Sequence, residues 1–154
     1  MTASGVRIAI AVVVRRDGGL VLAVRRPDEP GEELPGVWGL PATTLRDGEA
    51  AEAAIARLGR EKLGVALVPL RSLAEGDQRR EGYVLRMTLY EASMDGEPRL
   101  PARTDSAAGT LYDALDWLPA ESFRVAAEAG SLCCALFLAA TETEAREATP
   151  PAAP

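Results

Sequence analysis

Residues 38–65 read WGLPATTLRDGEAAEAAIARLGREKLGV and carry the strongest signal for both fold and function. Residues 49–63 are rich in alanine and lack proline, which favours a helix, and Gly64 suits the left-handed conformation that ends one. The stretch therefore predicts a loop at residues 41–48 and a helix at residues 49–63. This spacing is typical of a loop and helix that process phosphate, although several carboxylates that such a site needs are missing.

Apolar runs on both sides of this stretch indicate the strands of a sheet. We expect strands at residues 7–15, 20–26, 37–40, 65–73, 83–94 and 110–118. The turn at residues 17–19 joins the first two as a hairpin, and Pro69 restricts the fourth to a sheet edge or a bulge. Residues 27–35 and 95–109 are rich in turn formers and are expected to be loops.

The end of the chain is expected to be helical and then disordered. Ser131 suits the cap of a helix at residues 132–141, whose apolar residues should pack on the sheet. Residues 142–154 are charged and then rich in alanine and proline, which is typical of a frayed tail. We therefore expect one domain at residues 1–143 and a disordered tail at 144–154. The order of the elements predicts an α/β fold with a mixed sheet and helices on its faces.

Composition and charge exclude several classes of protein. The 154 residues carry a formal net charge of −6 and a pI near 4.8, which disfavours a nucleic-acid polymer or an anionic membrane as partner. A small phosphorylated ligand is compatible with this charge, because the arginine pairs at 25–26 and 79–80 could form a local anion site. The chain has no histidine, so histidine triads, histidine bases and most histidine-ligated metal sites are excluded.

The cysteines and the N-terminus indicate a location. Cys133 and Cys134 are adjacent in an apolar run and lack the spacing of metal ligands, so we interpret them as small buried hydrophobic residues in a reducing compartment. The N-terminal MTASGVR lacks the pattern of a signal peptide, and no apolar run reaches membrane-spanning length. We therefore expect a cytoplasmic protein.

Helical spacing alone gives the charged residues a structural interpretation. Arg57 and Glu61 are one turn apart, as are Leu58 and Lys62 on a neighbouring face. Glu49 lies at the start of the helix, where the helix dipole stabilises a carboxylate. On this basis the segment is a capped amphipathic helix with a solvated Arg57–Glu61 pair.

The spacing also resembles the Nudix box, G-x5-E-x7-R-E-U-x-E-E-x-G-U, in which U is a bulky aliphatic residue. The matching positions are Glu49, Arg57, Glu61, Gly64 and Val65, and the departures are Thr43, Leu58, Gly59 and Lys62. An offset register that uses Glu52, Arg60 and Glu61 loses the final glycine and every later acid, so we keep the first. RIAIAVVVRR, LVLAVRRP, the W-x-x-P turn and the Trp117-Leu118-Pro119 step also resemble the family, which implies a Nudix-like α/β/α sandwich.

The resemblance implies a metal-dependent hydrolase of a nucleoside diphosphate linked to another moiety. In the family, box glutamates hold Mg²⁺ or Mn²⁺ against the diphosphate while water attacks a phosphorus. The implied roles here are Glu61 and Asp116 as metal ligands, Arg57 as the group that orients the metal, and Asp116 alternatively as the base. Arg25 and Arg26 lie where family members often place an arginine that meets substrate phosphate.

The departures imply a weakened or altered metal site. Lys62 places an ammonium where a principal metal ligand is expected, and Leu58 replaces a second carboxylate with a hydrophobic residue that we expect to face the pocket. Thr43 replaces a glycine whose backbone carbonyl commonly helps to ligate metal. Gly59, in the middle of the helix, indicates either a close backbone contact or a helix no longer selected for catalysis.

Two functions stay open at this point. One is a hydrolase that uses Mg²⁺ or Mn²⁺ at an altered site. The other is a non-catalytic Nudix-fold module that binds a nucleotide-like ligand or a protein partner. Lys62 either contacts a ligand phosphate or is a solvated helix residue. A homodimer is compatible with the resemblance, although no residue demands it.

Overall fold

The computed structural model describes residues 5–26, 36–100 and 112–148, and its strands form two four-stranded sheets. The first sheet has the order β5 (Ala42–Thr44), β1 (Gly5–Val13), β7 (Tyr83–Asp95) and β6 (Ala66–Arg80). The second is built on β3 (Leu20–Arg25), which pairs with β2 (Arg15–Arg16), β4 (Trp38–Gly39) and β8 (Ala114–Pro119).

Strand β1 makes the first sheet mixed, because it pairs in parallel with β7 and antiparallel with β5. Ile10 and Val12 belong to one core cluster, whereas Ala11 and Val13 belong to the other, and all four are buried. Successive residues of a strand point to opposite faces, so both faces of this sheet must be covered.

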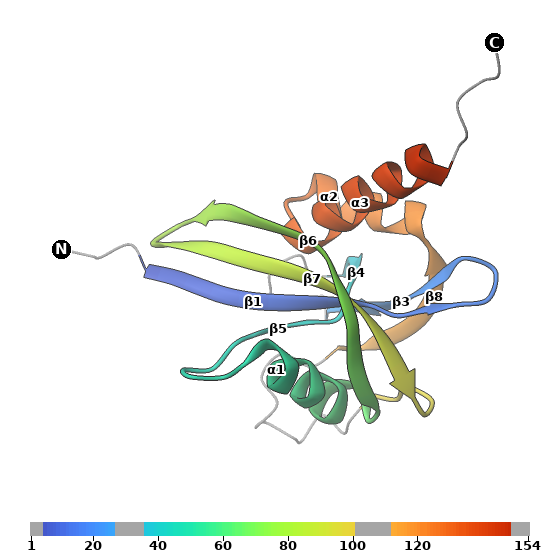
Figure 1. Ribbon diagram of the computed structural model, residues 1–154, viewed down its shortest axis with the longest axis horizontal. Helices are drawn as coiled ribbons and strands as arrows, with labels where there is room; N and C mark the ends of the chain where they lie inside the picture. Colours follow the sequence, from blue (N-terminus) through green and yellow to red (C-terminus); the bar gives the residue numbers. More distant parts are fainter. Residues whose placement is uncertain (1–4, 27–35, 101–111, 149–154) are drawn as a thin grey trace, which may run out of the picture.

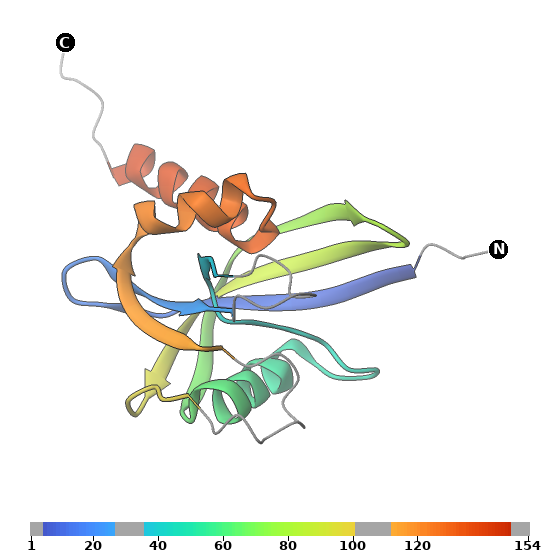
Figure 2. The same ribbon diagram turned by 180° about the vertical axis from the view of Figure 1, so that it is seen from behind.

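Helices cover both faces (Figures 1 and 2). On one side lie α1 (Ala51–Leu58) and the π-helical turn Gly59–Leu63 that continues it. On the other side lie the 3-10 turn Ala120–Phe123, α2 (Arg124–Glu128) and α3 (Leu132–Ala148). This arrangement confirms the predicted α/β/α sandwich with a mixed sheet. Gly64 ends the box helix with φ 66°, as the sequence predicted.

Strand β6 lies at the edge of the first sheet, where Pro69 predicted it. Its pairing with β7 shifts register between Pro69 and Arg71 and again between Ser72 and Ala74, which confirms the expected irregularity. The strand continues to Arg80, beyond the predicted end at residue 73.

The hairpin turn at residues 17–19 is present, but its first strand differs from the prediction. Gly18 and Gly19 have positive φ angles of 86° and 75°, which suit a tight turn. The residues that pair with β3 are Arg15 and Arg16, because β1 belongs to the other sheet.

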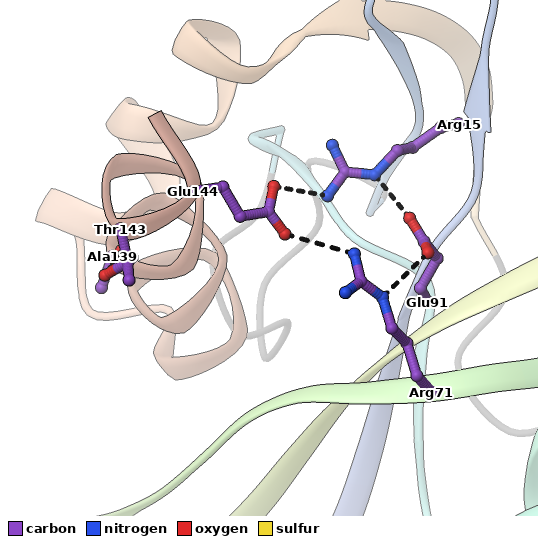
Figure 3. A network of polar contacts seen from close by, with 6 residues as sticks. All are labelled: Arg15, Arg71, Glu91, Ala139, Thr143 and Glu144. Carbon is purple, nitrogen blue, oxygen red and sulfur yellow. Dashed lines mark hydrogen bonds and ion pairs between the residues drawn. The ribbon is translucent and has the colours of Figure 1, made fainter. Parts of the chain in front are cut away.

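Helix α3 begins at the predicted cap and ends later than expected. The Cys134 backbone N–H donates to the Ser131 hydroxyl at 3.4 Å, and both cysteines are buried. Residues 144–148, which we expected in the disordered tail, are helical. Glu144 contacts Arg15 at 3.4 Å and Arg71 at 3.5 Å, and Glu91 joins the same two arginines from β7 (Figure 3). These ion pairs connect the C-terminal end of α3 to β2 and β6.

Parts of the sequence prediction lie outside the described residues, namely the loop at 27–35, most of the loop at 95–109 and the last six residues, 149–154. Within the described residues, no helix is both long and apolar enough to cross a membrane.

Candidate functional site

Arg57 is buried near the end of α1 and forms a bidentate ion pair with Glu49. Its Nε donates to Glu49 Oε2 at 2.9 Å, and its Nη2 donates to Oε1 at 2.8 Å. The same guanidinium donates to the Thr44 carbonyl at 2.9 Å and to the Thr43 hydroxyl at 3.3 Å. Glu49 also accepts the Arg46 backbone N–H at 3.0 Å. One buried arginine therefore holds both ends of the loop that precedes α1.

This pairing shifts the pKa of both groups. The hydrogen bonds from Arg57 and then from the Arg46 N–H lower the pKa of Glu49 from 4.5 to about 2. The hydrogen bond with Glu49 raises the pKa of Arg57. Both groups are therefore charged throughout the neutral range, and the loop is held at any pH in that range.

The position of Arg57 corrects one prediction and supports another. The predicted solvated Arg57–Glu61 pair is wrong, because the loop brings Glu49 to the guanidinium and Arg57 is buried. Glu52 and Arg60, which the offset register would use, are exposed. The structure therefore supports the register that places Glu49 and Arg57 at the first glutamate and the arginine of the motif.

Gly59 is required by a close approach of the chain. A Cβ at this position would lie 2.7 Å from the Val65 carbonyl oxygen and 2.8 Å from Leu67 Cγ. The Val65 N–H donates to the Gly59 carbonyl at 3.0 Å, which closes the helix onto the start of β6. Of the two explanations for this glycine, the structure supports the close contact.

Leu58 lies in the hydrophobic core and not in the pocket where we expected it. It is 1% exposed and belongs to the cluster that contains Ile10, Val12, Ile55 and Leu63. Residues 54, 55 and 58 form the apolar stripe of the helix, and this stripe packs on the sheet. A carboxylate at this position would be buried among aliphatic side chains.

Lys62 is also buried, at 8% exposure, so the solvated alternative is wrong. Its Nζ donates to the Ala42 carbonyl at 3.2 Å and lies 5.3 Å from the centre of the Tyr112 ring. Tyr112 holds the same residue of β5, because its hydroxyl donates to the Ala42 carbonyl at 3.2 Å and accepts the Ala42 N–H at 3.0 Å. Burial raises the pKa of Tyr112 to about 12, which keeps the hydroxyl protonated.

Glu61 is the box carboxylate that stays near the loop. Its Oε1 lies 3.5 Å from Arg46 Nη2, while its Oε2 is buried and has no hydrogen-bond partner among the described residues. The Arg46 side chain is 61% exposed, so this ion pair is weak.

Asp116 does not join Glu61. On β8, Leu115 and Trp117 pack on the cluster beneath α1, whereas Leu118 packs on the cluster beneath α3. Strand alternation therefore places Asp116 on the α3 side of the sheet. Its exposed carboxylate accepts the Trp117 backbone N–H at 2.7 Å. Its predicted role as metal ligand or base has no support from this geometry.

The two predicted phosphate-binding arginines have different surroundings. Arg25 Nε donates to Asp113 at 3.0 Å, and its guanidinium lies 5.4 Å from the centre of the Trp38 ring. Arg26 directly follows β3 and is half-buried. Its positive charge lowers the pKa of Tyr112, against the larger effect of burial.

A hollow of about 730 Å³ lies away from the box helix. Its walls come from β2, β6, β7 and β8 and include Arg15, Glu91, Met94 and Trp117. Arg16 covers the Trp117 ring at 4.7 Å. None of the box residues lines this hollow.

The donor set of the box does not fit the metal that the resemblance implies. Mg²⁺ requires several hard oxygen ligands in octahedral geometry. Leu58 is in the core, Lys62 places an ammonium on the Ala42 carbonyl, and Glu61 is the remaining box acid near the loop. Among the described residues, no group of three or more Asp, Glu, Cys or His side chains is arranged to hold a metal ion.

Sequence reasoning missed the contributions of Ala42, Arg46 and Tyr112 to this site. Ala42 contributes through its backbone, which no side-chain pattern reveals. Tyr112 is seventy residues from Ala42, so only the folded chain brings the two together. Arg46 precedes Glu49 by three residues, and the loop turns so that both approach the box helix.

Comparison with known proteins gives a consistent result. The NUDIX domain family matches residues 5–132 of the chain. The Escherichia coli ORF135 protein has a similar structure, with a TM-score of 0.70 and 20% identity over 97% of this chain and 96% of that one. A MutT protein from Methanosarcina mazei Go1 gives a TM-score of 0.70 and 16% identity, covering 97% of this chain and 100% of the other.

A third similar structure is a MutT NUDIX hydrolase from Burkholderia pseudomallei, at TM-score 0.63 and 26% identity, covering 83% of this chain and 100% of that one. No curated protein sequence matches the chain. The family match covers most of the sequence, and the fold is that of solved Nudix hydrolases. This chain therefore belongs to the NUDIX domain family.

Proposed function

We propose that this Nudix-family chain binds a small phosphorylated, nucleotide-like ligand with its own basic groups, and that it does not hydrolyse the ligand by the metal-assisted route of the family. The observation that carries the proposal is the position of Lys62. A buried ammonium lies on the Ala42 carbonyl, at the box position where a carboxylate is expected. A cation at that point repels a divalent ion and attracts a phosphate.

Basic side chains near this point support the anion-binding part of the proposal. Arg46 extends from the loop and is 61% exposed, and Lys62 lies beside the Tyr112 ring. We propose that Arg26 joins them, in keeping with the effect of its charge on the pKa of Tyr112. The whole chain carries a net charge of −6, so a local group of cations gives a specific attraction for a phosphorylated ligand. The net charge also leads us to propose that no nucleic-acid polymer is a partner. We propose a cytoplasmic location from the adjacent cysteines, Cys133 and Cys134, which suit a reducing compartment.

One observation favours a second candidate, a Nudix hydrolase with a weak metal site. Glu61 Oε2 is buried without a hydrogen-bond partner among the described residues, and such an acceptor is costly unless something binds it. In this second candidate Glu61 would hold Mg²⁺ or Mn²⁺, and the ion would supply electrostatic stabilisation of the phosphate charge.

A paired assay distinguishes the two candidates. ADP-ribose, a nucleotide sugar, a dinucleotide and nucleoside triphosphates are tested for hydrolysis with Mg²⁺ or Mn²⁺, and for binding by calorimetry in EDTA. We expect binding of at least one compound in EDTA and no turnover with either metal. Turnover that Glu61→Gln abolishes, and that the matched exposed substitution Glu52→Gln leaves intact, would defeat the proposal in favour of the hydrolase.

The basic groups are tested in the same binding assay. Arg46→Ala should weaken binding of the compound several-fold, because it removes an exposed cation beside the site. Arg60→Ala removes an exposed cation from the neighbouring helix and serves as the control. Equal affinity of the two variants would remove Arg46 from the proposed site.

A further inference from the structure

The three residues of β5, which precede the loop at residues 45–48, are each held by a cation from the box helix. Lys62 donates to the Ala42 carbonyl at 3.2 Å, while Arg57 donates to the Thr43 hydroxyl at 3.3 Å and to the Thr44 carbonyl at 2.9 Å. The two cations come from successive parts of one stretch of helix, since Arg57 is in α1 and Lys62 is in the π-helical turn. Strand β5 is thus joined to the helix at two separate points.

The contact at Ala42 is built from buried groups. Lys62 is 8% exposed and Tyr112 is 5% exposed. The Tyr112 hydroxyl occupies both polar groups of Ala42, and the Tyr112 ring lies beside the ammonium at 5.3 Å. A buried ammonium is unfavourable unless oxygen and aromatic partners replace water, and both kinds of partner are present here.

We propose that Lys62 is a positioning residue whose ammonium serves as a fixed internal cation, joining β5 to the box helix so that the loop that follows β5 keeps its shape without a divalent ion. The π-helical turn brings the side chain to Ala42 on β5. Because the positive charge belongs to the chain, it is present at every metal concentration. This inference goes beyond the proposed function, since it concerns how the loop is held and not what the site binds.

The same arrangement opposes metal binding at this point. A divalent ion that approached the Ala42 carbonyl would meet the ammonium that already binds this oxygen. Like charges repel strongly in a poorly hydrated site. A wild-type loop should therefore be insensitive to Mg²⁺ and Mn²⁺.

Hydrogen–deuterium exchange of the loop amides tests this directly. Lys62→Met removes the charge, and Arg60→Met makes the same chemical change two residues away at an exposed position. We expect exchange in residues 42–48 to rise about tenfold in Lys62→Met, as the loss of a charge-assisted hydrogen bond predicts, and to stay at the wild-type rate in Arg60→Met. The melting temperature should fall by about 4 °C in Lys62→Met only.

Two further variants keep the test decisive if Lys62→Met does not fold. Lys62→Gln retains a donor without the charge and should also speed exchange in residues 42–48. Lys62→Glu should do so too, and Mn²⁺ should slow that exchange in Lys62→Glu while leaving wild type unchanged. Equal loop exchange in the Lys62 and Arg60 variants, or a wild-type loop that Mn²⁺ protects, would overturn the inference. Neither result bears on ligand binding in EDTA, so the ligand-binding part of the proposed function is judged separately.

Discussion

In the first half of the Nudix box, Glu49 and Arg57 form a buried bidentate ion pair, whereas in the second half Leu58 and Lys62 stand at the positions of two glutamates. The first half shapes the loop, and its Glu49–Arg57 pair is present although Thr43 replaces the leading glycine. The second half would hold a metal ion, and of its three acidic positions only Glu61 keeps a carboxylate. The difference teaches that the part of the motif that builds the loop can persist independently of the part that supplies the chemistry.

Both halves nevertheless act on the same segment of chain. Arg57 holds Thr43 and Thr44, and Lys62 holds Ala42. The replaced half has therefore acquired a structural contact with β5. Substitutions in each half test how much that half contributes to the stability of the fold and how much it affects metal binding.

The largest effect is expected from restoring an acid at Leu58. Leu58→Glu should lower the free energy of unfolding by about 4 kcal/mol or more, because it removes core packing and buries a carboxylate among aliphatic residues. Leu58→Met, which conserves volume, should cost about 1 kcal/mol. Urea unfolding measures both. A stable Leu58→Glu protein would show that this position can open to the pocket.

The next effect concerns the first half. Glu49→Ala should cost about 3 kcal/mol, because it leaves the buried Arg57 guanidinium without its carboxylate. Glu52→Ala, an exposed acid on the same helix, should change stability by less than about 0.5 kcal/mol. The account of the first half would be wrong if the two variants unfolded at the same urea concentration.

A smaller effect on stability is expected at Gly59, in the second half of the box. Gly59→Ala should cost about 2 kcal/mol, since its Cβ would lie 2.7 Å from the Val65 oxygen, even though alanine favours helices. Gly39→Ala is the control, because its Cβ would meet only Cys134 Sγ at 3.8 Å. Thermal unfolding compares them, and an unchanged melting temperature for Gly59→Ala would contradict the close approach.

The smallest expected effect is on how the stability of the fold depends on pH. The pKa of Glu49 is lowered from 4.5 to about 2 in the folded chain, so its contribution to stability is present above pH 4.5 and is lost as pH falls toward 2. Wild type should therefore lose more stability between pH 5 and pH 3 than Glu49→Gln does. Urea midpoints across this range measure the difference, and parallel curves would show that Glu49 does not titrate with folding.

The sequence predicted most of the architecture because its signals are local, although it missed β5 (Ala42–Thr44), which lies within the predicted loop at residues 41–48. The alanine-rich helix, its glycine stop, the turn at residues 17–19 and the proline in β6 each act within a few residues of themselves. The close contact at Gly59 was one of the two explanations that the sequence offered. A glycine in mid-helix lowers stability, so a neighbouring group that leaves no room for a side chain is a reason for it.

The site was less predictable because its contacts are not local. Helical spacing assigned Arg57 to Glu61, but the folded loop supplies Glu49. Asp116 was assigned from the family resemblance, as the residue directly before Trp117, and the alternation of β8 turns it to the other face. Leu58 was assigned to the pocket from the motif alone, whereas the apolar stripe of the helix directs it to the core.

The central claim is that Lys62 has taken the place of a bound cation, and a titration of the purified chain with Mn²⁺ followed by electron paramagnetic resonance tests it most directly. Wild type should show no saturable binding at micromolar Mn²⁺, and Lys62→Glu should bind more Mn²⁺ than Arg60→Glu, in which an exposed residue undergoes the same charge change. Saturable binding of Mn²⁺ to wild type at micromolar concentration, lost in Glu61→Gln, would contradict the account.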